Sequence, residues 1–233
     1  MFPIRDDTPR FSTPYVTYFL IAFNFLIFFF EWSLTPESLD LLIRQFAVIP
    51  SHITAALNGS RQIMLGQAFL PVLTSMFLHG SWMHVIGNMW FLWIFGDNIE
   101  DYVGHFKFLI FYLLSGIAAT FLQYILSPSS RVPNVGASGA IAGVLGAYFV
   151  LYPRARVLTW FPIFFMFYLP AWVMLGYWFV YQFLSGAATS ITYSSDVNRG
   201  GVAFWAHVGG FVAGLVMIKI FPARQRRHAY GTW

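Results

Sequence analysis

The sequence predicts an all-α membrane protein built from six apolar spans. Of its 233 residues, 58% are hydrophobic and only 9% are charged, and the mean hydropathy is +0.64. A soluble domain would carry a charge on roughly a quarter of its residues. Six segments also approach or exceed the length of about 20 residues that crosses a hydrocarbon core. We therefore expect the lipid bilayer to surround this chain.

The first expected span is 14–32, which follows a polar start and is too long for the apolar part of a signal peptide. A long connection, 33–74, contains amphipathic pieces such as 39–46 and 63–73. Pieces of this length are too short to cross a bilayer and fit an interfacial structure better. We expect a first loop that is embedded at the membrane surface.

Five further spans follow the first loop. They are expected at 82–100, 106–126, 138–152, 158–184 and 202–221. Pro162 and Pro170 interrupt the fifth of these. We expect a single membrane domain, 1–233, with short cytoplasmic tails at about 1–13 and 222–233.

The basic residues of the loops predict the orientation of the chain. If the N-terminus is cytoplasmic, nine of the 13 basic residues lie on the cytoplasmic side and four lie outside. Both termini should then be cytoplasmic, with the start of the fourth span toward the outer leaflet. A chain of six spans with short tails suits a bacterial inner membrane.

Composition excludes several kinds of function. The chain has no cysteine, so disulfides, thiolate catalysis and cysteine-based metal sites are not available. The basic residues flank apolar runs and form no stripe, so we expect no nucleic-acid partner. The H-E-x-x-H pattern of membrane zinc proteases is absent. Aspartyl proteolysis needs two facing acids within the spans, whereas all nine acidic residues lie at span ends or in loops.

Ser138 begins the fourth span within the run G-A-S-G-A at 136–140. Small residues there have two interpretations. They let membrane helices pack closely, and they also let a serine hydroxyl approach a neighbouring helix as a nucleophile. The G-x-S-x-G elbow of soluble hydrolases needs a preceding strand, but Pro133 and Asn134 precede this run.

The sixth span supplies a general base for that serine. Gly210 and Gly214 follow His207 at positions that share its helical face. A lone membrane histidine is usually a packing residue. Here the histidine lies on a glycine-lined helix face opposite a serine on another glycine-lined face, and this arrangement favours catalysis. Because no acid lies at that depth, we expect a Ser138–His207 dyad without a carboxylate.

The second span carries candidate donors for an oxyanion. His84 and Asn88 are four residues apart, so they lie one above the other on a helix. Both can donate to a tetrahedral oxyanion together with the backbone N–H of Ser138. His79 precedes the span and is expected to be a structural hydrogen-bonding residue.

Taken together, these motifs resemble the rhomboid family of intramembrane serine proteases over nearly the whole chain. The nucleophile motif of the family corresponds to 136–139, its catalytic histidine to His207, and its oxyanion group to His84 and Asn88. Further positions match the family near its site or at the end of the second span: His79, Gly136, Gly139, Gly210 and Glu100. Gly214 is expected near the site because it shares the helical face of His207. The flexible cap of the family corresponds to 196–201.

The resemblance implies a six-span rhomboid-like bundle with a membrane-embedded first loop and no cofactor. It also implies cleavage of single-span membrane proteins in or near their transmembrane segment. Aromatic side chains of the fifth span would form a lateral gate or contact lipid.

Two positions depart from the family pattern. Leu70 and Pro71 stand where many members carry Trp-Arg, so we expect the first loop to be anchored differently. Ala142 stands where many members carry an aromatic residue that stacks on the imidazole, which leaves open what holds His207.

Two other functions remain open. A catalytically weak rhomboid-like protein would only bind membrane clients, and loss of the serine or the histidine would indicate it; both are present. A small transporter would show internal repeats with matching broken helices, and the sequence has no such repeat.

Overall fold

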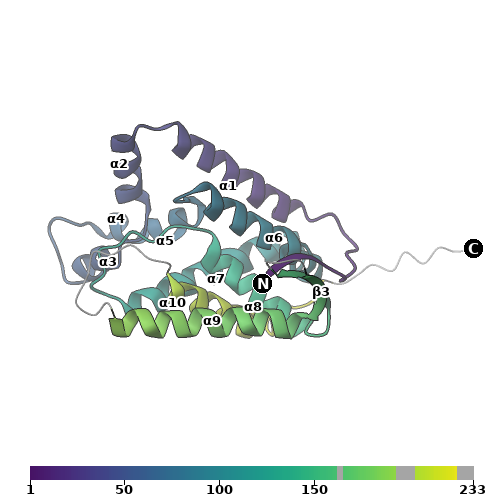
Figure 1. Cartoon of the computed structure of the whole chain (residues 1–233). Coiled ribbons are helices and arrows are strands. Elements are labelled where there is room, and N and C mark those ends of the chain that lie inside the picture. Colours follow the sequence, from purple (N-terminus) through teal and green to yellow (C-terminus); the bar gives the residue numbers. More distant parts are fainter. Residues whose placement is uncertain (162–164, 193–202, 225–233) are drawn as a thin grey trace, which may run out of the picture.

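The computed structural model describes residues 1–161, 165–192 and 203–224, most of which are helical (Figure 1). The helices are α1 (Tyr15–Ser33), α2 (Pro36–Phe46), α3 (Pro50–Leu57), α4 (Leu65–Phe69), α5 (Pro71–Thr74), α6 (Trp82–Val103), α7 (His105–Leu126), α8 (Ser138–Leu151), α9 (Ala171–Thr192) and α10 (Phe204–Met217). A short 3₁₀ helix covers Ser75–Phe77, and the strands are β1 (Phe2–Asp6), β2 (Arg156–Phe161) and β3 (Phe165–Pro170).

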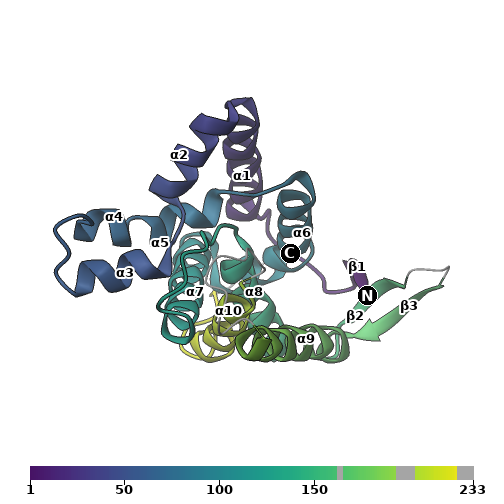
Figure 2. The same cartoon turned by 60° about the vertical axis from the view of Figure 1, so that its left-hand side comes forward.

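Helix α8 forms the centre of the bundle. Every residue from 139 to 148 is buried, and the neighbouring α7, α9 and α10 lie around it (Figure 2). A helix that is apolar on all sides is expected to lie inside a protein. Its 14 residues extend only about 21 Å at 1.5 Å per residue, less than the hydrocarbon thickness of about 30 Å. In a bilayer, at least one end of α8 would therefore lie below the surface of the hydrocarbon layer.

The start of α1 is held by a carboxylate from the end of α6. The first N–H groups of a helix have no partner within it, and Glu100 accepts hydrogen bonds from the backbone N–H groups of Val16 (2.9 Å) and Thr17 (2.7 Å). The Thr17 hydroxyl and His105 Nδ1 also bond this fully buried carboxylate, at 2.7 and 2.5 Å. Glu100 thus joins α1, α6 and α7 at one end of the bundle.

The expected start of the fifth span is wrong. Strands β2 and β3 form an antiparallel hairpin where the helix was expected, and α9 begins only at Ala171. The segment before α9 is rich in β-branched and aromatic residues, which favour strands, and Pro170 at its end cannot donate a ladder hydrogen bond.

A third strand comes from residues that were expected to form a polar tail. Strand β1 pairs with β2, so that Phe2 lies opposite Trp160. The indole of Trp90 on α6 donates to the Pro3 carbonyl (2.7 Å) and stacks on Phe2. The sheet therefore links α6 to the beginning of α9.

The first loop folds into the short helices α2 to α5, which project from one side of the bundle (Figure 2). Backbone contacts help to fasten it: Val48 and Asn134 form an antiparallel bridge, and the N–H of Ser51 donates to the Ser130 carbonyl (2.9 Å). The Thr74 hydroxyl donates to the Phe46 carbonyl (2.8 Å). These bonds anchor a loop that lacks the Trp-Arg pair.

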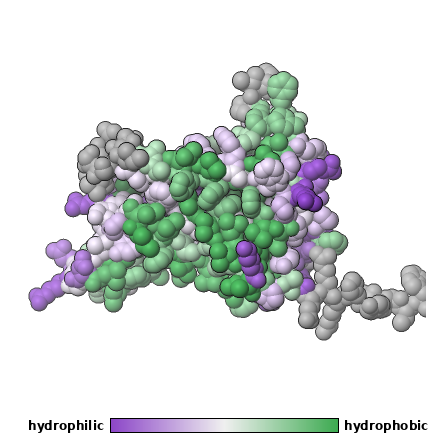
Figure 3. All heavy atoms as spheres, turned by 90° about the horizontal axis from the view of Figure 1, so that it is seen from below, coloured by the Kyte–Doolittle hydropathy of each residue, from purple (hydrophilic) through white to green (hydrophobic). Residues whose placement is uncertain are grey.

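Two described helices, α1 and α7, are long and apolar enough to cross a membrane. A third span results if the bent pair Leu65–Phe77 and Trp82–Val103 is counted as one, while α8 and α10 are shorter apolar helices. The face drawn in Figure 3 is largely apolar across its middle, and α1 and α7 also carry exposed large apolar side chains such as Phe19, Leu26 and Phe121. The number of six spans stays a prediction.

Candidate active site

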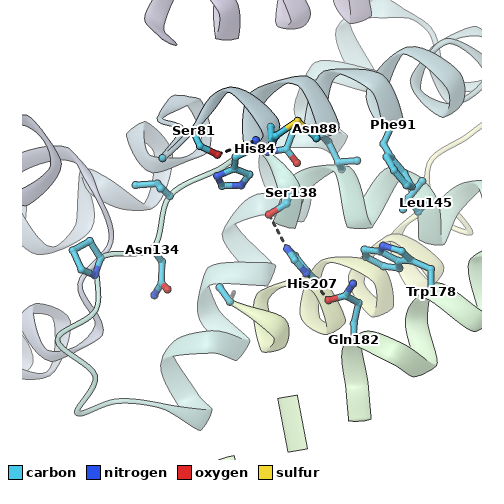
Figure 4. Close-up of a pocket in the computed structure, with 17 residues that line it drawn as sticks. Ser81, His84, Asn88, Phe91, Asn134, Ser138, Leu145, Trp178, Gln182 and His207 are labelled. Atoms are coloured by element: carbon cyan, nitrogen blue, oxygen red, sulfur yellow. Dashed lines mark hydrogen bonds between the residues drawn. The ribbon is translucent and has the colours of Figure 1, made fainter. Parts of the chain in front are cut away.

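The loop before α8 brings Ser138 next to α6 (Figure 4). Gly136 in this loop has a φ of +123°, which favours glycine, and its N–H donates to the Ser75 carbonyl (2.9 Å). A Cβ at this position would lie only 2.7 Å from His84 Nε2. Glycine therefore allows the backbone to pass directly beside His84.

Glycines let α8 and α10 touch along their backbones. A Cβ added to Gly210 would collide with the carbonyl oxygen of Gly139, and one added to Gly214 would collide with that of Gly143. This is the small-residue packing that membrane helices use to approach closely. The approach holds the first turn of α10 against the first turn of α8.

The structure brings Ser138 and His207 together at this crossing. His207 Nε2 lies 2.8 Å from Ser138 Oγ, and the imidazole is 8% exposed. A hydroxyl and an imidazole at this distance can exchange a proton without rearrangement.

Two side chains of α9 hold the other side of the imidazole (Figure 4). Gln182 Oε1 lies 2.8 Å from His207 Nδ1, and the Trp178 ring packs on the imidazole with centroids 5.8 Å apart. The indole occupies the supporting role that Ala142 cannot fill. Sequence reasoning assigned Gln182 no role, although a buried amide inside an apolar helix is the kind of polar residue that marks a functional position.

His84 and Asn88 lie on α6 and line the same cavity as Ser138 (Figure 4). Ser81 caps this helix by accepting from the His84 N–H (3.2 Å), so His84 lies in its first turn. The Asn88 amide nitrogen is buried and has no hydrogen-bond partner among the described residues. A buried donor without a partner is costly, and it is available to an oxyanion in this cavity.

His79 lies behind the cavity instead of lining it. It is 3% exposed, and its backbone N–H donates to the Glu31 carboxylate of α1 (3.1 Å). Its ring packs edge to face against His84, with centroids 5.1 Å apart. Both ring nitrogens of His79 are buried without a hydrogen-bond partner among the described residues, so the hydrogen bond to Glu31 comes from the backbone and not from the side chain. The ring therefore supports His84 by packing, and sequence reasoning had not identified the contribution of Glu31.

The cavity has a volume of about 640 Å³ and a mixed lining. Its polar side chains come from four helices, the loop before α8 and the turn before α6: Ser81, His84, Asn88, Asn134, Ser138, Gln182 and His207. In the part of the chain that the structure describes, no three acidic or histidine side chains are grouped to hold a metal ion. The expected cap at 196–201 lies outside the described residues.

The fold and the site define a helical protein with an apolar surface and a serine–histidine pair in a partly polar cavity. A family model named Rhomboid domain matches residues 66–224. The chain belongs to the rhomboid family.

Three relatives share this region. "Rhomboid protein 1, mitochondrial" of Saccharomyces cerevisiae is 30% identical over 70% of this chain and 47% of its own length. "Presenilin-associated rhomboid-like protein, mitochondrial" of Bos taurus is 30% identical over 62% of this chain and 36% of its own. "Rhomboid-like protein 11, chloroplastic" of Arabidopsis thaliana is 29% identical over 67% of this chain and 55% of its own. The chain therefore spans about a third to a half of the length of these relatives.

Family membership makes this chain an integral membrane protein. The family includes serine proteases and acts on membrane proteins within the lipid bilayer. The three relatives are mitochondrial or chloroplast proteins, so they give the expected bacterial inner membrane no support.

Proposed function

We propose that this protein is an intramembrane serine endopeptidase that cleaves single-span membrane proteins in or near their transmembrane segment. The observation that carries the proposal is the 2.8 Å distance between Ser138 Oγ and His207 Nε2 within the cavity. We further propose that the chain forms one rhomboid domain with six spans and that the reaction needs no cofactor.

His207 acts as the general base of the reaction. Its neutral Nε2 takes the proton of Ser138 while Oγ attacks the scissile carbonyl, and the imidazolium then returns a proton to the leaving amine. Water repeats the sequence on the acyl-enzyme and releases Ser138. The pair needs no carboxylate, because a serine and a base in hydrogen-bond reach form the minimal nucleophilic unit.

The oxyanion of the tetrahedral intermediate is held by the Ser138 backbone N–H, His84 and Asn88. The unpartnered Asn88 amide and the His84 ring, close to the loop that precedes Ser138, support this assignment. Removing one such donor costs about 3 kcal/mol of transition-state stabilisation in other enzymes.

The reaction takes place below the membrane surface. The short α8 begins at Ser138, so the nucleophile lies at a depth where substrate peptide groups are paired within a helix. Substrates should therefore carry small or helix-breaking residues at the cut site, because these unwind easily.

The first and the last described segments support an orientation with both termini on one side of the membrane. The Asp6 carboxylate bonds the Tyr148 hydroxyl near the end of α8, and the Arg224 N–H donates to the Tyr102 carbonyl (2.6 Å). Both contacts lie at the end of the bundle away from Ser138. We propose that this is the cytoplasmic side, as the distribution of basic residues predicts.

Labelling of purified protein with a fluorophosphonate tests the proposal, because the probe reacts with an activated serine. Wild type should be labelled, whereas Ser138→Ala and His207→Ala should not. Equal labelling, or no labelling, of all three would overturn the proposal and indicate a rhomboid-like protein that binds membrane clients.

A further inference from the structure

We infer that Gln182 is a positioning residue that fixes which nitrogen of His207 carries the proton. The inference rests on the proposed function, because it concerns the general base of that reaction. Its basis is the geometry of the imidazole, which has Ser138 Oγ at 2.8 Å from Nε2 and Gln182 Oε1 at 2.8 Å from Nδ1.

A neutral imidazole has one N–H and one acceptor nitrogen. Nε2 can take the proton of Ser138 only when it is the acceptor, so Nδ1 must carry the hydrogen. An N–H at Nδ1 needs an acceptor, and the Gln182 carbonyl oxygen provides one. The opposite tautomer would point an N–H at Ser138 and leave that hydroxyl without a base.

Among the described residues, no carboxylate accepts the hydrogen on Nδ1 of His207. In the part of the chain that the structure describes, the titratable group that faces His207 across the cavity is His84 from α6, while α8 contributes Ser138 and α9 contributes Gln182 and the Trp178 ring. On α7, Gln123 Oε1 accepts a hydrogen bond from the backbone N–H of Ala206, next to His207 (3.2 Å). The acceptor for Nδ1 is thus an amide on α9.

The position of Gln182 along α9 fits a role in orientation. Trp178 precedes it by four residues, so the two side chains share one helical face, and both contact the same imidazole. Gln182 is itself only 7% exposed, which shields its hydrogen bond from competing water. The indole restrains the ring from one side while the amide sets its protonation, so the state of the base depends on where α9 lies.

The test compares Gln182→Leu and Gln182→Glu with wild type, using the second-order rate of fluorophosphonate labelling between about pH 5 and 9. Gln182→Leu leaves a buried N–H without a partner, so labelling should slow by about 10-fold to 100-fold. Gln182→Glu can still accept this hydrogen bond and should label at least about 10-fold faster than Gln182→Leu. Its carboxylate also stabilises the imidazolium, so the acidic limb of the pH profile should move up by about 1–3 units.

Thr189→Val provides a matched control on the same helix. Among the described residues, the Thr189 hydroxyl donates to the Ser185 carbonyl of α9 (2.7 Å) and does not contact the imidazole, so this variant should label like wild type with an unchanged pH profile. A Gln182→Leu rate and profile equal to those of wild type would overturn the inference. Equally slow labelling of Gln182→Glu and Gln182→Leu, with melting temperatures like that of wild type, would overturn it too.

Nuclear magnetic resonance of ¹⁵N-labelled histidine tests the same claim without any activity. The His207 signal, assigned by its loss in His207→Ala, should show the hydrogen on Nδ1 in wild type and a mixture of tautomers in Gln182→Leu. The same tautomer in both proteins would overturn the inference. Absence of labelling in wild type would instead overturn the proposed function, and the tautomer measurement would still decide the role of Gln182.

Discussion

A single methyl group at Gly136 should disable the oxyanion site without touching the Ser138–His207 pair. In Gly136→Ala the new Cβ would lie 2.7 Å from His84 Nε2, whereas ordinary contact begins at 3.4 Å. The His84 ring would have to retreat by the difference, about 0.7 Å. A hydrogen bond of about 2.9 Å stretched by that amount is no longer a hydrogen bond.

The expected loss follows from the role of the displaced donor. Losing one oxyanion donor lowers the rate by about 10²-fold to 10³-fold, or about 3–4 kcal/mol. The φ of +123° adds backbone strain of about 1–3 kcal/mol in any residue with a Cβ. We therefore predict a large loss of activity together with a lower melting temperature.

The assay is the second-order rate of fluorophosphonate labelling of the detergent-solubilised protein. Thermal unfolding is measured in the same solution. Gly66→Ala is the matched control, because Gly66 lies in α4 and a Cβ there meets no atom within 4 Å. A folded Gly136→Ala protein that labels as fast as Gly66→Ala would refute the assignment of His84 to the oxyanion.

Three further predictions concern the site and its supports. Asn88→Ala should lower kcat for a cleaved substrate by about 100-fold with little change in KM; a change in KM alone would contradict the oxyanion role. Glu100→Ala should destabilise the protein by about 2–5 kcal/mol, because it leaves the buried N–H groups at the start of α1 without an acceptor, and thermal unfolding would show a lower melting temperature. Burial raises the pKa of Asp6 above its ordinary value of 3.8, so the folded protein holds this proton more tightly than the unfolded chain, and stability falls as pH rises from about 4 through the raised pKa. Asp6→Asn should therefore improve thermal stability relative to wild type more at about pH 7 than at about pH 4; a constant difference would show that Asp6 does not titrate in this range.

The features that the sequence predicted well are encoded locally. Helices α6 and α8 begin at Trp82 and Ser138, where the expected spans began, because apolar runs bounded by turn residues are visible in a short window. The seam between α8 and α10 follows from helical spacing, which places Gly210 and Gly214 on the face of His207. Family membership, expected from these motifs, is confirmed by the match over 66–224.

The features that were missed depend on contacts between distant segments. The sheet forms because residues 2–6 pair with 157–160, and no local pattern reveals a partner that lies about 150 positions away. The hydrophobic run at 158–184 looked like one long helix because short apolar strands and buried helices share the same composition.

The support of His207 could not be predicted from its own helix. Its two holders, Trp178 and Gln182, lie on α9, and which face of α9 turns inward depends on packing that periodicity alone does not fix. Ala142 had shown that a support was missing, but the substitute comes from a different helix.

The most direct test of the central claim is proteolysis in a bilayer. The protein would be reconstituted into liposomes with a set of single-span membrane proteins that carry small or helix-breaking residues in their helices, and the product termini would be read by mass spectrometry. We predict cleavage in or next to the transmembrane segment by wild type and none by Ser138→Ala. The account would be contradicted if wild type and Ser138→Ala gave the same products. It would also be contradicted if wild type bound the substrates but gave no products.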